Sequence, residues 1–143
     1  MKRKIHIFLF VIYILVLLRI TVFRSGFSLT NFLSGGSVNL ALFSDLISVA
    51  RNDIFTFIYL FVGNLIWFVP LGLLLPIIGL KRKTTFALGF LLSLLSEILQ
   101  YLFAIGVTEL DDLILNTLGC LIGIGVYSFK IHTTERKKKC QKK

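Results

Sequence analysis

Polar side chains that could bind a ligand or move a proton lie inside long apolar runs of this sequence. They are carboxylates, carboxamides and one guanidinium: Arg19, Asn64, Glu97, Gln100, Asp112 and Asn116. Carboxylates accept hydrogen bonds and carboxamides both donate and accept them, so the set could bind a polar ligand. Two carboxylates could also serve as general acid and general base, which makes Glu97 and Asp112 the candidate catalytic residues. Whether the protein is an enzyme stays open at this stage.

The apolar surroundings of these groups make them informative. A charged side chain at the centre of a bilayer costs roughly 2.5–3.5 kcal/mol on insertion scales. Glu97 is therefore expected to be either paired, with Arg19 as its counter-ion, or protonated. For Asn64 and Gln100 a structural role is an equal alternative, because intramembrane amides often only join helices. No nucleophile–histidine–acid set, phosphate-binding glycine loop or redox motif accompanies them.

The composition indicates an integral membrane protein. Hydrophobic residues make up 56% of the 143 residues, and apolar runs long enough to span a bilayer recur along the chain. We predict an all-α membrane bundle that forms one domain over residues 1–143. Its four spans are expected at about residues 5–23, 54–80, 84–105 and 113–129, followed by a basic tail at 130–143.

Two segments have more than one interpretation. Pro70 and Pro76 lie in the second span and predict either a kinked or a broken helix. Between the first two spans, small and polar residues recur at helical spacing beside an apolar stripe: Ser37, Ala41, Ser44, Ser48 and Arg51 on one face, and Leu40, Phe43, Ile47 and Ala50 on the other. This spacing predicts a short amphipathic helix at the membrane interface, and a helix packed over the mouth of the bundle is the alternative.

Basic residues predict the orientation of the spans. With both termini cytoplasmic, thirteen Lys and Arg residues lie inside, at 2–4, 81–83 and from 130 onward, and only Arg24 and Arg51 lie outside. This bias follows the positive-inside rule, so we expect the basic blocks to set topology and the tail to attract anionic lipid. Nucleic acid is not an expected partner.

The predicted orientation brings the polar groups of the spans to similar heights. At 1.5 Å per residue, Arg19 and Glu97 both lie roughly 20 Å above the inner ends of their spans. Asp112 lies at the outer mouth, and Asn116 lies one helical turn below it. The sequence therefore predicts a common polar cavity in the outer half of the bilayer, open to the outside.

The helical face that carries Asp112 and Asn116 continues to Gly119 and Gly123. Two glycines four residues apart let another helix approach closely, which predicts a homo-oligomer, or assembly into a larger membrane complex, through this face. The two cysteines and two histidines are scattered along the chain, and neither a metal site nor a cofactor is expected.

Three stretches of the second half resemble the VanZ-like family of small bacterial membrane proteins: NLIWFVPLGLLLP at 64–76, SEILQ at 96–100 and DDLILNTLGCLIG at 111–123. The family pattern is N-x-x-x-F-x-P-x-G, then E-x-x-Q, then D-x-x-x-N-x-x-G. The residues that match it are Asn64, Phe68, Pro70, Gly72, Glu97, Gln100, Asp112, Asn116, Gly119 and Gly123. The upstream segment VNLALF departs from the family at Leu42, where a proline is usual.

The resemblance implies a multi-pass protein of the bacterial cytoplasmic membrane. The family's namesake is an accessory protein that gives low-level resistance to the glycopeptide teicoplanin. We therefore expect the predicted cavity to bind an envelope ligand: a lipid headgroup, a cell-wall lipid precursor or the glycopeptide itself. A small intramembrane enzyme that acts on an envelope lipid is the alternative function. The lipid bilayer is the partner that composition alone implies.

Overall fold

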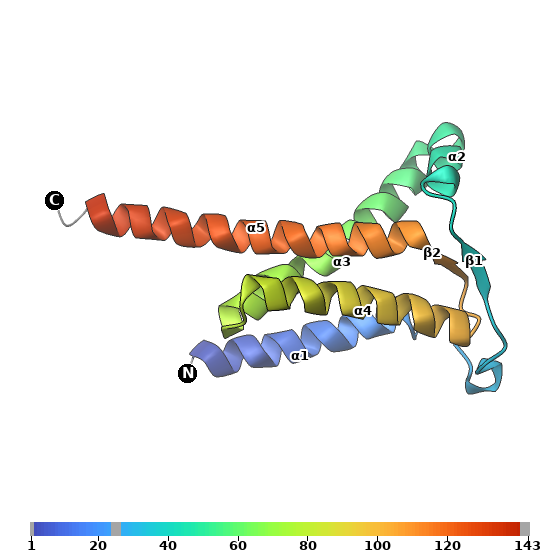
Figure 1. The fold of residues 1–143 in the computed structure, drawn as a ribbon, viewed down its shortest axis with the longest axis horizontal. Helices are drawn as coiled ribbons and strands as arrows, with labels where there is room; N and C mark the ends of the chain where they lie inside the picture. Colours follow the sequence, from blue (N-terminus) through green and yellow to red (C-terminus); the bar gives the residue numbers. More distant parts are fainter. Residues whose placement is uncertain (1, 24–26, 141–143) are drawn as a thin grey trace.

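A computed structural model describes residues 2–23 and 27–140 of the chain. Four of its helices are long and apolar enough to cross a membrane. They are α1 (Lys2–Thr21), α3 (Ile54–Ile78), α4 (Arg82–Leu102) and α5 (Leu110–Cys140). The prediction of an all-α membrane bundle with four spans is confirmed (Figure 1).

Two helices differ in detail from their predicted spans. The second predicted span is one continuous helix, α3, with Pro70 and Pro76 inside it, so a broken helix is excluded. The fourth, expected at about 113–129, begins at Leu110 and runs for 31 residues. Asp111 and Asp112 in its first turn favour the earlier start, because carboxylates interact well with a helix N-terminus. Lys and Arg are good helix formers, which lets the helix continue beyond its apolar part.

Helices α3 and α5 touch backbone to backbone along a glycine seam, which consists of Gly72 on α3 and Gly119 and Gly123 on α5. A Cβ atom added to Gly119 would lie 2.0 Å from the carbonyl oxygen of Leu65, and one added to Gly123 would lie 2.1 Å from that of Val69. These glycines do allow a close helix approach, but the approaching helix is α3 of the same chain. A homo-oligomer stays a prediction, but Gly119 and Gly123 face α3, so another surface would have to form its interface.

The core beside the glycine seam ties α1 to the other spans. Phe68, Leu71 and Cys120 are fully buried there, and Leu17 of α1 packs in the same cluster. The Tyr13 hydroxyl donates to the carbonyl of Trp67 at 2.6 Å, which joins α1 to α3 near the middle of both helices.

One end of the bundle carries a small cap. It consists of the short helix η1 (Leu29–Asn31), the strands β1 (Ser37–Asn39) and β2 (Val107–Glu109), and helix α2 (Ser44–Asn52). The two strands are parallel, with Val38 opposite Thr108. The predicted amphipathic helix is thus confirmed only from Ser44 onward. Upstream of Ser44 the backbone groups of the chain pair with β2 and with Asp111 instead, so the helix begins later.

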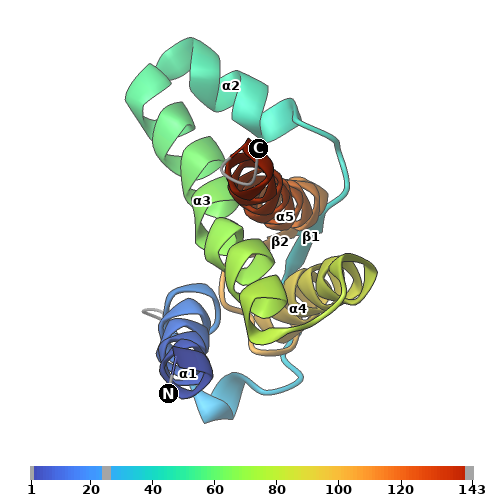
Figure 2. The same cartoon turned by 90° about the vertical axis from the view of Figure 1, so that its left-hand side faces the viewer.

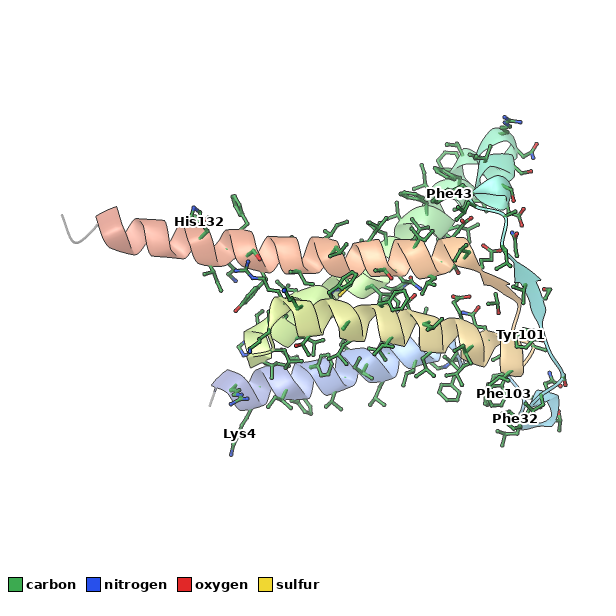
Figure 3. The ribbon with its side chains drawn as sticks, in the orientation of Figure 1. Lys4, Phe32, Phe43, Tyr101, Phe103 and His132 are labelled. Atoms are coloured by element: carbon green, nitrogen blue, oxygen red, sulfur yellow. The ribbon has the colours of Figure 1, made fainter. Side chains whose placement is uncertain are left out.

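The opposite end of the bundle holds both chain termini and the turn between α3 and α4 (Figures 1 and 2). Figure 3 places Lys4 and His132 at this end and Phe32 and Phe103 at the cap. All three basic blocks of the sequence therefore belong to the end opposite the cap. This arrangement agrees with an even number of membrane crossings.

Candidate ligand-binding cavity

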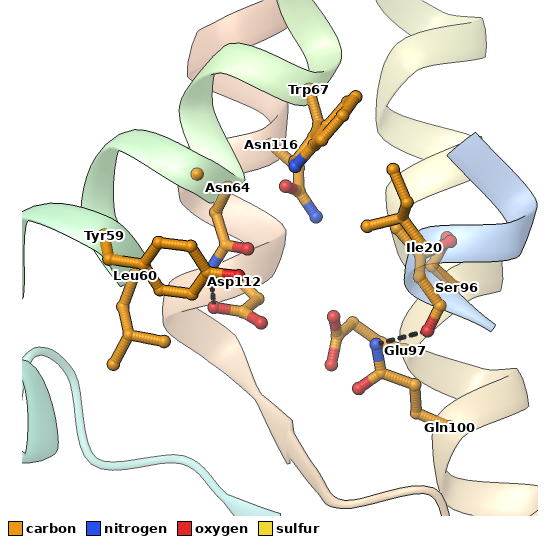
Figure 4. A pocket seen from close by; sticks show the side chains of 12 residues that line it. Ile20, Tyr59, Leu60, Asn64, Trp67, Ser96, Glu97, Gln100, Asp112 and Asn116 are labelled. Atoms are coloured by element: carbon orange, nitrogen blue, oxygen red, sulfur yellow. Dashed lines mark hydrogen bonds between the residues drawn. The ribbon is translucent and has the colours of Figure 1, made fainter. Parts of the chain in front are cut away.

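A cavity of about 360 Å³ lies between the four long helices, toward the cap. Its lining residues come from every span: Ile20, Thr21, Tyr59, Leu60, Gly63, Asn64, Trp67, Ser96, Glu97, Gln100, Asp112 and Asn116 (Figure 4). Five of the six predicted site residues are among them. Residues that are widely separated in sequence thus meet around one space.

The wall formed by α3 and α5 is closed by a side-chain pair. Asn64 donates its amide N–H to a carboxylate oxygen of Asp112. Asn116, one turn further along α5, is buried and points into the same space. The glycine seam begins immediately below these residues, so it fixes how closely α3 and α5 approach at the cavity floor.

The wall formed by α4 is organised by strand β2. The buried Glu97 carboxylate accepts a hydrogen bond from the backbone N–H of Glu109 at 3.0 Å, and the Glu97 backbone carbonyl accepts one from the Thr108 hydroxyl at 3.2 Å. Gln100, one turn further along, donates to the backbone carbonyl of Thr21 at 3.3 Å. Strand β2 connects α4 to α5, and its hydrogen bond to Glu97 holds that carboxylate on the side of the cavity opposite Asp112 (Figure 4).

A second, smaller cavity adjoins the first under the cap. Its volume is about 210 Å³, and its lining consists of Leu46, Leu60, Asn64, Gln100, Val107, Glu109 and Asp112. Four of these residues, among them Asn64 and Asp112, also line the larger cavity. The Asn64–Asp112 pair thus forms a partition between the two spaces.

Arg19 lies apart from the cavity. Its side chain is exposed on α1, and its guanidinium donates to the carbonyl of Phe23 one turn later. It is not among the lining residues, so the structure lends no support to its predicted pairing with Glu97. That pairing stays a prediction.

Asp111, next to Asp112 in sequence, joins two elements of the fold and does not line a cavity. Its buried carboxylate accepts the backbone N–H of Phe43 at 2.9 and 3.0 Å from its two oxygens. Phe43 adopts a left-handed conformation with φ of 55° immediately before α2. Asp111 therefore attaches the start of α2 to the start of α5, and it lines neither cavity.

Sequence reasoning missed several lining residues. Ser96 could have been found, because it precedes Gln100 by four residues and so shares a helical face with it. Tyr59, Leu60 and Ile20 gave no signal, since they are apolar or aromatic residues in an apolar span. Thr21 takes part through its backbone carbonyl, which no side-chain pattern reveals.

Carboxylates take part in the lining of both cavities. Glu97, Asp112 and Glu109 contribute carboxylates to the two cavities, and no Lys, Arg or His of the described residues lines either one. Within the same described part of the chain, no group of three His, Cys, Asp or Glu side chains could hold a metal ion. The chemistry that the described side chains offer is hydrogen bonding to amides and carboxylates.

Comparisons with known proteins point to one family. A family model described as VanZ/LLP1 matches residues 10–131. The chain is also similar to Protein VanZ of Enterococcus faecium, at 41% identity over 81 residues, which cover 54% of this chain and 49% of that protein. The chain thus spans about half the length of this curated relative. No solved structure matches.

Proposed function

The chain belongs to the VanZ/LLP1 family, and from this premise we propose that it binds an envelope ligand in its polar cavity and thereby contributes to teicoplanin resistance. The ligand is a lipid headgroup, a cell-wall lipid precursor or the glycopeptide. Asn64, Glu97, Gln100, Asp112 and Asn116 supply its hydrogen bonds. The teicoplanin role is the one that the family's namesake has.

One observation carries the proposal. Polar residues that the family pattern places on three different helices line one cavity, and none of the three helices could form it alone. A purely structural set would be expected to satisfy its hydrogen bonds in pairs and leave no space between the helices. Here about 360 Å³ remains, which is within the range of ligand pockets.

We also propose that both termini are cytoplasmic, in the bacterial cytoplasmic membrane, so that the cavity faces outward. The grouping of the basic blocks at the end opposite the cap supports this orientation, because such blocks stay on the cytoplasmic side. Reporter fusions after Lys83 and Lys143 are expected to report the cytoplasm, and a fusion in the loop after Asn31 the outside.

The test of the binding role uses substitutions that keep shape and remove charge. Glu97→Gln and Asp112→Asn are expected to abolish the increase in teicoplanin tolerance that the wild-type chain gives its host. Asp45→Asn is the matched control, because Asp45 is an exposed carboxylate on α2 outside both cavities. Unchanged tolerance in both cavity variants, at equal protein levels, would refute the proposal.

An intramembrane enzyme is the second candidate, and the facing positions of Glu97 and Asp112 favour it. One carboxyl would protonate a leaving group while the other activates water or a hydroxyl. Purified protein would then convert a labelled envelope lipid, and both Glu97→Gln and Asp112→Asn would stop turnover. Binding without turnover would leave the first proposal as the better account.

A further inference from the structure

Asn116 is a buried side chain of the larger cavity that the described residues leave without a hydrogen bond. Its exposed fraction is 5%, and none of the described residues donates to its carboxamide or accepts from it. Figure 4 shows this carboxamide pointing into the space between the helices. A buried polar group without a partner is costly, so such a group usually meets water or a ligand. Asn116 thus points to a molecule that enters the cavity.

The two other carboxamides of the lining differ from Asn116. Asn64 donates to the Asp112 carboxylate of α5. Gln100 donates to the backbone carbonyl of Thr21 in α1 at 3.3 Å, so a carboxamide of this lining does bind main chain. Each of these two amides joins a pair of helices, which is the usual role of an intramembrane carboxamide. Asn116 joins no pair among the described helices, so packing does not explain it.

A second unpartnered group lies at the level of Asn116 on α4. Gly89 faces Cys120, because a Cβ added to Gly89 would lie 2.4 Å from the Cys120 sulfur. Helices α4 and α5 are antiparallel (Figure 1), so one turn toward the cap brings Ser93 to the level of Asn116. The Ser93 hydroxyl is buried and has no hydrogen-bond partner in the described part of the chain, but Ser93 lines neither cavity. Of these two groups, Asn116 is the one that an entering molecule can reach.

The Asn116 carboxamide offers an acceptor oxygen and a donor N–H₂ on adjacent atoms. An ionised phosphate offers only acceptors and an ammonium only donors, so either would leave one half of this side chain unpaired. In an extended peptide the N–H and the C=O of one residue point in the same direction, as they do where two residues exchange both hydrogen bonds in a β-ladder. One peptide residue can therefore pair with both halves of Asn116 at once.

We infer that Asn116 binds the backbone of an extended peptide segment of the ligand, through paired hydrogen bonds to the N–H and the C=O of one residue. A volume of about 360 Å³, near the lower end of ligand pockets, suits a short segment of this kind. This inference rests on the proposed binding function, and it names the chemical class of the ligand and the residue that selects it.

The one tryptophan of the chain, Trp67, lines the cavity, so its fluorescence reports occupancy. Purified protein in lipid nanodiscs is titrated with acetylalanine methylamide and with its ester analogue, in which an oxygen replaces the alanine N–H. The peptide is expected to give half of the fluorescence change at an about tenfold lower concentration, because the ester leaves the Asn116 oxygen unpaired. Equal midpoints for the two compounds overturn the inference.

Two variants separate Asn116 from the neighbouring side chain at its level. Asn116→Leu keeps the approximate shape of the side chain without its donor and acceptor, and it should remove the preference for the peptide over the ester. Ser93→Ala is the matched control and should keep the preference, since Ser93 also lacks a partner among the described residues but does not line the cavity. Retained preference in Asn116→Leu, or lost preference in Ser93→Ala, contradicts the assignment to Asn116.

Thermal unfolding gives a readout that a structural role would move. Asn116→Leu breaks no hydrogen bond between described residues and removes a buried polar group without a partner, so it is expected to unfold at or above the wild-type temperature. Asn64→Leu loses the hydrogen bond to Asp112 and is expected to unfold at a lower temperature. If the unfolding temperature of Asn116→Leu falls as far as that of Asn64→Leu, Asn116 is structural and the inference fails.

Competition identifies the source of the peptide. Palmitoylalanine methylamide, which stays in the bilayer, and teicoplanin are each added to protein that holds acetylalanine methylamide. Displacement by either one names the source, and displacement by neither overturns the inference. If Glu97→Gln changes teicoplanin tolerance while peptide and ester bind equally, the proposed function stands and this inference fails. If the peptide is preferred and tolerance never changes, the inference stands and the resistance role fails.

Discussion

Helices α3 and α5 meet in two contrasting ways along a single stripe of α5. The lower part of the stripe, Gly119 and Gly123, forms the glycine seam, where no Cβ would fit. The upper part, Asp112 and Asn116, borders the cavity, where about 360 Å³ is left open. The same spacing of three and four residues thus produces backbone contact in one half and an open cavity in the other.

The contrast shows what each half contributes. Backbone contact at the seam allows only one relative rotation and one separation of α3 and α5, because any side chain larger than that of glycine would clash there. With that geometry set, Asn64 donates a hydrogen bond to Asp112 and forms the partition with it, although 48 residues separate them in sequence. The rigid half therefore positions the open half, and the two should respond differently to substitution.

The largest effect is expected at the seam. In Gly119→Leu the new side chain meets the backbone of Leu65, which cannot move away as a flexible side chain would. Overpacking of a core typically costs about 1–3 kcal/mol, and a clash with backbone should exceed the upper value. We expect loss of monodisperse, thermally stable protein in detergent, measured by size exclusion and unfolding.

Gly125→Leu serves as the control for this experiment, because Gly125 is an exposed glycine of the same helix with open space around it. A Gly119→Leu protein as stable as the Gly125→Leu protein would show that the seam is adaptable. The cavity geometry would then need another explanation.

An intermediate effect is expected at the partition. Asn64→Ala removes a donor to the Asp112 carboxylate and should cost about 1–3 kcal/mol of unfolding free energy. Asn52→Ala is its control, since the Asn52 amide donates to the Ser48 carbonyl on the exposed face of α2. A cost for Asn64→Ala no larger than that for Asn52→Ala would mean that the partition adds no stability.

The smallest effect is expected where α3 leaves the bundle. Asp53 caps α3 and accepts hydrogen bonds from the hydroxyl and the backbone N–H of Thr56, which hold the pKa of this exposed carboxyl below its ordinary value of 3.8. A lowered pKa contributes stability above pH 3.8 that is lost as the pH falls through the lowered value. Thr56→Val should move the carboxyl titration, followed by NMR, upward. An unmoved midpoint would exclude the hydroxyl as the cause.

Local pattern predicted most of the fold, and long-range pairing accounts for the rest. The four spans follow from the length of apolar runs, and the site residues follow from polar groups inside them. The two strands could not be predicted, because three residues of Ser37–Asn39 have no signal without their partner at Val107–Glu109. The prediction that Phe43 belongs to the amphipathic helix was wrong for the same reason. Its backbone N–H donates to Asp111, which is 68 residues away in sequence.

The sequence by itself determined the membrane class, the four spans and the family, and it named five polar residues that line the cavity. Apolar length, charge placement and polar residues in apolar runs are local properties, and the bilayer makes each of them costly to violate. Only the tertiary structure decided that the glycines contact α3 of the same chain, that Arg19 lies outside the cavity, and that residues of all four spans line one cavity. These outcomes depend on the angle at which helices cross, which packing fixes and composition does not.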